Sequence, residues 1–165
     1  MKKILYFGGQ KSGKSALAEA KAIELSKNSK PYYIATYDNS YNDTAMQEKI
    51  NTHILQRKDN FISIEQTHNL LEVIKENETY LIDCMSMWIL NNIDKNNEYF
   101  ITQINAISKI NVNIVFVLND VNSGIIPLDK QSRRFVDITG IVGANLVNIC
   151  NEVYEVKFTL GNRLK

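Results

Sequence analysis

Short apolar runs alternate along the chain with longer segments that carry apolar residues at helical spacing. The apolar runs predict strands at 2–7, 32–36, 80–83, 114–118 and 153–158. Helical spacing predicts helices from residue 13 onward and at 43–57, 69–75, 100–110 and 130–150. The run 114–118 is the most strand-like and is expected at the sheet centre, whereas 61–65 fits either a short strand or an extended loop. This alternation favours one α/β domain over residues 1–165, with a mostly parallel sheet and helices on both faces.

The residues that follow the first apolar run form a complete G-x-x-x-x-G-K-S phosphate loop. Its predicted nucleotide contacts are Gly8, Gly9, Gln10, Lys11, Ser12, Gly13, Lys14 and Ser15. Such a loop turns its backbone N–H groups toward phosphate oxygens, and the helix that follows adds its positive end. Lys14 is the candidate catalytic charge for the terminal phosphates, and the Ser15 hydroxyl is a candidate Mg²⁺ ligand. The flanking strand and helix distinguish the motif from a glycine-rich turn, so we predict a P-loop NTPase-like fold that binds a nucleoside triphosphate.

A second candidate lies at the end of the run 80–83. Asp83 follows apolar residues, as the Mg²⁺-side aspartate of a Walker B strand does, although it could also cap the next helix. With a phosphate loop in the chain we favour the metal role, because ligands bind at the carboxyl ends of such strands. The D-x-x-G at 137–140 falls inside a helical pattern, and the chain lacks an N-K-x-D motif. A signalling GTPase is therefore not expected.

Composition narrows the function classes further. The net charge of +1 argues against a broad nucleic-acid surface or a polybasic membrane contact. No apolar run approaches the ~20 residues of a membrane span, and the chain starts with a strand pattern rather than a signal peptide. Cys84 and Cys150 are too few for a disulfide framework or a zinc site and are expected as core residues. These features predict a cytoplasmic protein without nucleic-acid or membrane partners.

The chain has two histidines, His53 and His68. His68 opens a polar segment and is expected to face solvent. His53 lies beside the apolar stripe of the helix predicted at 43–57. On the residues alone, such a histidine is more often a surface or structural residue than a catalyst.

Taken together, these motifs resemble the bifunctional adenosylcobinamide kinase and adenosylcobinamide-phosphate guanylyltransferase family of cobalamin biosynthesis. The similar segments, in the family's order, are 8–15, 33–36 (Y-I-A-T), 46–53 (M-x-x-K-I-x-x-H), 61–65, 81–88, 119–127 and 133–137. The resemblance implies that ATP or GTP phosphorylates adenosylcobinamide, and that GMP from GTP is then transferred to the phosphate through a guanylylated histidine. His53 matches that histidine, and neutral imidazole is a competent nucleophile at pH 7.

The same resemblance implies a wider site and an assembly. It adds nucleotide contacts at Tyr33, Ile34, Ala35, Thr36 and Glu65 to those of the phosphate loop and Asp83. It also implies a homo-oligomer, a trimer, with the corrinoid substrate in a cleft between subunits.

The sequence departs from the family pattern in places that leave the phosphate loop untouched. Ala45 and Ile54 replace an acidic and a basic residue, Asn122 replaces a glycine, and 141–144 lack the usual R-x-N-Q. These changes bear on the corrinoid contacts and on whether both activities are retained. Two alternatives therefore stay open: a P-loop kinase of another small metabolite in which His53 is idle, and a non-catalytic nucleotide-binding module.

Overall fold

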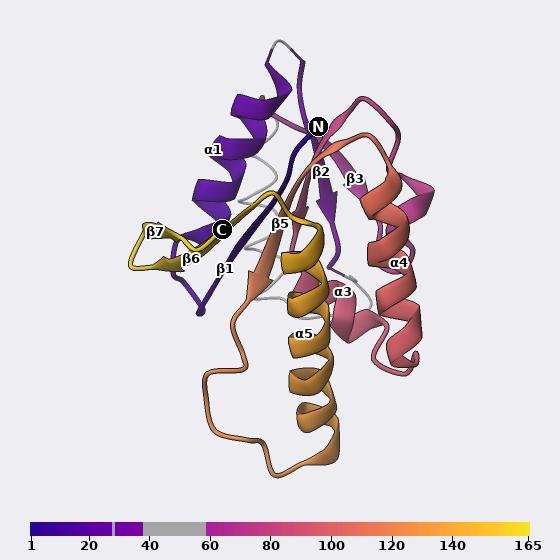
Figure 1. Ribbon diagram of the computed structural model, residues 1–165, viewed down its shortest axis with the longest axis vertical. Helices are drawn as coiled ribbons and strands as arrows, with labels where there is room; N and C mark the ends of the chain where they lie inside the picture. Colours follow the sequence, from indigo (N-terminus) through magenta and orange to yellow (C-terminus); the bar gives the residue numbers. More distant parts are fainter. Residues whose placement is uncertain (28, 38–58) are drawn as a thin grey trace.

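The computed structural model describes residues 1–27, 29–37 and 59–165. Its centre is a sheet of seven strands in the order β3-β2-β4-β5-β1-β6-β7. The strands are β1 (Lys3–Gly8), β2 (Tyr32–Ala35), β3 (Ile62–Glu65), β4 (Thr79–Asp83), β5 (Asn113–Asn119), β6 (Glu152–Lys157) and β7 (Leu160–Arg163). Every pairing is parallel except that of β6 with β7. The predicted, mostly parallel α/β sheet is confirmed, with β5 at its centre (Figure 1).

Helices cover both faces of this sheet. They are α1 (Lys14–Ser26), α3 (Met85–Asn91), α4 (Asn97–Lys109) and α5 (Lys130–Ile149), with a short 3-10 helix, η2 (Leu70–Glu72). On one face, Ala18 and Ala22 of α1 pack on Val115 and Val117 of β5. On the other face, α3, α4 and α5 share a cluster with Phe116. The strand β5 is therefore covered on both sides, which is why its apolar residues run without alternation.

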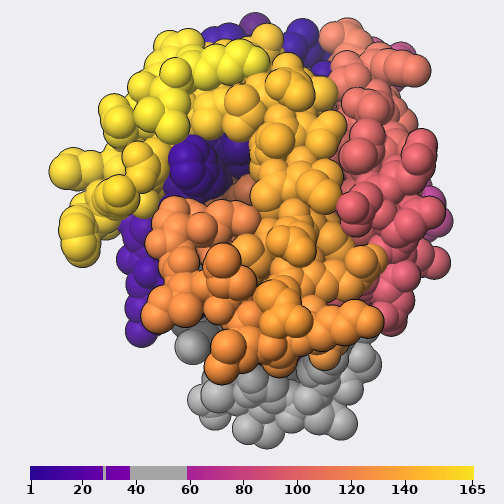
Figure 2. Space-filling model, turned by 60° about the horizontal axis from the view of Figure 1, so that its bottom comes forward, coloured from indigo at the N-terminus to yellow at the C-terminus, as the bar shows by residue number. Residues whose placement is uncertain are grey.

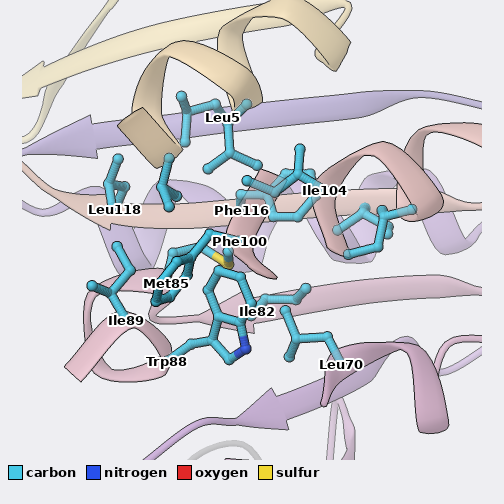
Figure 3. Packing of buried hydrophobic residues seen from close by; sticks show 14 of the residues in the cluster. Leu5, Leu70, Ile82, Met85, Trp88, Ile89, Phe100, Ile104, Phe116 and Leu118 are labelled. Atoms are coloured by element: carbon cyan, nitrogen blue, oxygen red, sulfur yellow. The ribbon is translucent and has the colours of Figure 1, made fainter. Parts of the chain in front are cut away.

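The larger cluster lies under α3, α4 and α5. Figure 3 shows Leu5, Ile82 and Phe116 of the sheet among side chains from these helices. Trp88 is fully buried, and its ring meets that of Phe100 edge to face, with centroids 5.2 Å apart. This packing fixes α3 directly beyond the end of β4, where the candidate Asp83 lies.

The secondary structure differs from the sequence prediction in three places. The helix predicted at 69–75 is only the single turn η2, because the Tyr80 hydroxyl donates to Val73 O (3.0 Å) and accepts from Lys75 N–H (3.0 Å). These bonds take backbone groups that a continuing helix would use. The helix α3 was not predicted, because its seven residues make only about two turns, too few to show a helical period. No strand was predicted after the run 153–158, but the exposed strand β7 follows it.

Several smaller expectations can also be compared with the structure. Segment 61–65 contains the strand β3, and the D-x-x-G at 137–140 lies within α5. His68 is exposed, as predicted. Cys150 is buried and Cys84 half-buried, and both are free thiols. The helix predicted at 43–57, with His53, lies outside the described residues. No helix in the described part of the chain combines the length and apolarity needed to cross a membrane.

Candidate nucleotide-binding site

The phosphate loop connects β1 to α1 in a conformation that demands glycine at two points. Gly13 adopts a left-handed φ of 93° just before α1, and a Cβ there would lie 2.9 Å from Thr159 Cγ2. Gly8 closes β1, and a Cβ there would lie only 2.3 Å from Val156 O. Inside the loop, Ser12 N–H donates to Gly9 O (3.2 Å). The chain therefore curls tightly between the end of a central strand and the positive end of a helix.

Two polar groups of this loop are suited to an anion. Lys14 is buried, and its ammonium donates to Gly9 O (3.2 Å) across the loop. Burial lowers the pKa of Lys14, while the nearby Cys84 and Asp83 act in the opposite direction. Ser12 Oγ is buried and has no hydrogen-bond partner among the described residues. A phosphate group would supply acceptors to both side chains, which offsets the cost of burying them.

Asp83 ends β4 at the same edge of the sheet. It is half-buried, and the Tyr33 hydroxyl donates to Asp83 Oδ2 (3.3 Å). The N-cap of α3 is Cys84 and not Asp83, so the alternative that Asp83 caps this helix is not supported. The sheet order places β5 between Asp83 and the phosphate loop, and the effect of Asp83 on the pKa of Lys14 links the two electrostatically.

Thr36 acts as a structural support for this acidic corner. It is fully buried just after β2, and its hydroxyl donates to Cys84 O (2.7 Å) and accepts from Cys84 N–H (3.1 Å). Its own carbonyl accepts from Asn91 Nδ2 of α3 (2.7 Å). The Thr36 side chain therefore fixes the backbone beside Asp83 and has its hydrogen bonds satisfied within the protein.

The other predicted contacts divide by the face of β2 on which they lie. Tyr33 lies on the face of the sheet that is covered by α1, the helix that follows the phosphate loop. Ile34 points to the opposite face and is fully buried in the large cluster, so its side chain lies away from the face that carries Tyr33 and α1. Ala35 pairs in register with both Asp83 and the exposed Glu65, which brings these three residues to one edge. His53 lies outside the described residues, and its distance from the loop stays a prediction.

One contact at this site is not predicted by any sequence pattern. Thr159, in the turn between β6 and β7, donates its backbone N–H to Ser12 O (2.8 Å). Phe158 and Thr159 both have left-handed φ values, 49° and 66°. Glycine and asparagine are the residues typical of such turns, and neither occupies these positions, so the sequence does not predict the turn. Figure 2 shows the indigo N-terminal residues at the floor of a hollow that the yellow C-terminal residues, α5 and the orange loop before it surround.

A metal ion here would depend on few protein ligands. Within the described residues, no three His, Cys, Asp or Glu side chains are grouped to hold one. The predicted pair, Ser15 at the start of α1 and Asp83 at the end of β4, offers a hydroxyl and a carboxylate oxygen. Mg²⁺ that is bound with nucleotide commonly takes one or two such groups and completes its shell with phosphate oxygens and water.

The sheet order and the loop after β1 define a P-loop NTPase-like, nucleotide-binding protein. In line with this fold, the chain superposes on the flagellar accessory protein FlaH of Methanocaldococcus jannaschii with a TM-score of 0.53 at 14% identity. The superposition covers 99% of this chain and 78% of that one. The family model described as cobinamide kinase / cobinamide phosphate guanyltransferase matches residues 4–163, and the chain belongs to this family.

Two curated relatives agree with this assignment. The chain is 30% identical to the bifunctional adenosylcobalamin biosynthesis protein CobU of Escherichia coli (strain K12), over 98% of this chain and 99% of CobU. It is 27% identical to the bifunctional adenosylcobalamin biosynthesis protein CobP of Pseudomonas aeruginosa (strain PAO1), over 90% of this chain and 89% of CobP. The likeness therefore extends over almost the whole chain, and the protein is an enzyme of cobalamin biosynthesis.

Proposed function

We propose that this protein phosphorylates adenosylcobinamide with ATP or GTP, and then transfers GMP from GTP to the product through a guanylylated His53. The observation that carries the proposal is the family match over residues 4–163, which includes the phosphate loop and the segment of His53. Two relatives, both named bifunctional, support two activities in one chain. The departures at Ala45 and Ile54 flank the His53 segment without altering the histidine itself.

The first reaction would be a phosphoryl transfer. The aminopropanol hydroxyl oxygen of the corrinoid forms a bond to the γ-phosphorus as its proton passes to solvent, the bond to the β–γ bridging oxygen breaks, and the nucleoside diphosphate leaves with that electron pair. The loop amides and the ammonium of Lys14 would bind the phosphates and stabilise the developing charge. Ser15 and Asp83 would hold Mg²⁺, which supplies further positive charge at the phosphate oxygens when bound.

The second reaction would use the same loop for a nucleotidyl transfer. A ring nitrogen of His53 attacks the α-phosphorus of GTP, and pyrophosphate leaves. A phosphate oxygen of adenosylcobinamide phosphate then attacks the same phosphorus, which releases the imidazole and forms adenosylcobinamide-GDP. A trimer with the corrinoid between subunits, in the cytoplasm, completes the proposal.

Labelling with α-³²P GTP tests the histidine directly. We expect the wild type to retain label that is stable in base and lost in acid, as a phosphoramidate is, and the His53→Ala variant to retain none. His68→Ala is the matched control, because it removes the other histidine at an exposed position. Full guanylyl transfer by His53→Ala would refute the nucleophile. If neither protein is labelled but both consume triphosphate with cobinamide, the kinase without transferase activity is the better assignment.

A further inference from the structure

The turn between β6 and β7 is in direct contact with the phosphate loop. Thr159 N–H donates to Ser12 O (2.8 Å), and Thr159 Cα lies 3.0 Å from the position that a Cβ would take at Gly13. Both turn residues have left-handed φ values, so the chain reverses sharply where it meets the loop. The turn thus forms a wall at the start of α1, on the opposite side of β1 from β5 and β4.

The position of Asp83 orients a bound triphosphate relative to this wall. Asp83 ends β4, which the sheet order places on the other side of β1 from β6 and β7. In P-loop enzymes the loop lysine and the Walker B acid serve the terminal phosphates and their metal ion. The terminal phosphates therefore lie toward β4, and the nucleoside lies toward β6 and β7.

Phe158 stands at this nucleoside end with its ring uncovered. It is 91% exposed and takes part in no aromatic pair among the described residues, so its ring adds little to the core. We infer that the turn Phe158–Thr159 is the base-side wall of the nucleotide site, and that the Phe158 ring stacks on the purine. This inference rests on the nucleotide binding assigned above.

Stacking has a consequence for nucleotide choice. An aromatic face contacts the π-face of any base and does not read the hydrogen-bonding pattern of its edge. Phe158 therefore contributes equally to guanine and adenine nucleotides. This matches a site that uses ATP or GTP in the phosphorylation step, and it leaves guanine selection in the second step to other groups.

Titration calorimetry with GTP, ATP and inorganic tripolyphosphate tests the stacking. For Phe158→Ala we expect the Kd of both nucleotides to rise about tenfold, the effect of losing a stacked aromatic ring, and the Kd of tripolyphosphate to stay unchanged. Phe158→Tyr keeps an aromatic face and should bind as the wild type does. Leu160→Ala is the matched control, because Leu160 lies on the same hairpin and is 75% exposed.

Each other outcome is decisive. Unchanged GTP affinity in Phe158→Ala, or an equal loss for GTP and tripolyphosphate, would overturn the stacking. The stacking would also be overturned if Phe158→Ala kept its GTP affinity but showed a smaller particle mass than the wild type in ultracentrifugation. That result would assign the ring to a contact between copies of the chain. If the wild type binds none of these compounds, the nucleotide site is refuted together with its wall. If the wild type binds GTP and Phe158→Ala binds it equally well, only the wall is refuted.

Discussion

Replacing Gly8 by alanine should disrupt the junction on which the nucleotide site is built. Gly8 ends β1, which is paired with β5 on one side and β6 on the other. An alanine Cβ would lie 2.3 Å from Val156 O and 2.9 Å from Ser12 Oγ. The serine can rotate, but Val156 O belongs to the backbone of β6, which is itself paired with β7. The strands β1 and β6 must therefore move apart.

The size of the effect follows from this overlap. Overpacking a close-packed interior by one methyl group costs about 1–3 kcal/mol. Since the clash is with backbone, we expect a loss of about 2–3 kcal/mol in the free energy of unfolding, near the upper end of that range. For a chain of this length, that corresponds to a fall in Tm of about 4–12 °C. GTP binding should weaken as well, because Ser12 and the loop start move with β1.

Urea denaturation followed by tryptophan fluorescence measures the loss. Trp88 is the single tryptophan and is fully buried, so its emission reports the unfolding of the core. Gly9→Ala is the matched control for stability, because a Cβ at Gly9 would meet no atom within 4 Å. We expect it to remain within about 0.5 kcal/mol of the wild type. Equal stability of the Gly8 and Gly9 variants would refute the reasoning.

Two further predictions concern buried groups near the ends of the sheet. Thr36→Val removes both hydrogen bonds to Cys84 and should lower the free energy of unfolding by about 1–3 kcal/mol. It should also weaken Mg²⁺-dependent GTP binding, because the backbone beside Asp83 loses its support. Thr139→Val, which removes only a bond to a carbonyl of its own helix, is the control in the same urea assay, and an equal loss in both variants would contradict this role. Burial raises the pKa of Cys150 to about 12 from 9.0, so above pH 9 the unfolded thiol ionises while the folded thiol keeps its proton. The free energy of unfolding should therefore fall as the pH rises above 9. In urea titrations at pH 9 and above, Cys150→Ala should make this fall shallower by about 1.4 kcal/mol per pH unit. Parallel pH curves for the two proteins would exclude a contribution from Cys150.

The parts of the site that the sequence predicts are those that local patterns encode. The unit of strand, phosphate loop and helix is contiguous from residue 3 to residue 26, so the strand and helix patterns that identify the loop lie directly beside it in the sequence. The same holds for β5, whose unbroken apolar run reflects cover on both faces. Asp83 could be placed at a strand end, but only the structure shows that Cys84, and not Asp83, is the N-cap of α3.

Other features depend on contacts that no local pattern contains. Ile34 was expected at the nucleotide because it lies within a similar segment, yet side chains alternate along a strand, so Ile34 must face away when Tyr33 faces α1. The helix α3 has only seven residues, too few to show a period. The contact of Thr159 with Ser12 joins the two ends of the chain and depends on a turn without glycine.

That last contact constrains when a newly made chain can acquire its ligand. The loop at residues 8–15 leaves the ribosome well before Val156 and Thr159, against which Gly8 and Gly13 pack. Contacts so distant in sequence form late, since the intervening chain must be ordered first. A nascent chain therefore carries the phosphate-binding motif before it carries the surface that shapes it, and that surface can form only after β6 and β7 have been synthesised.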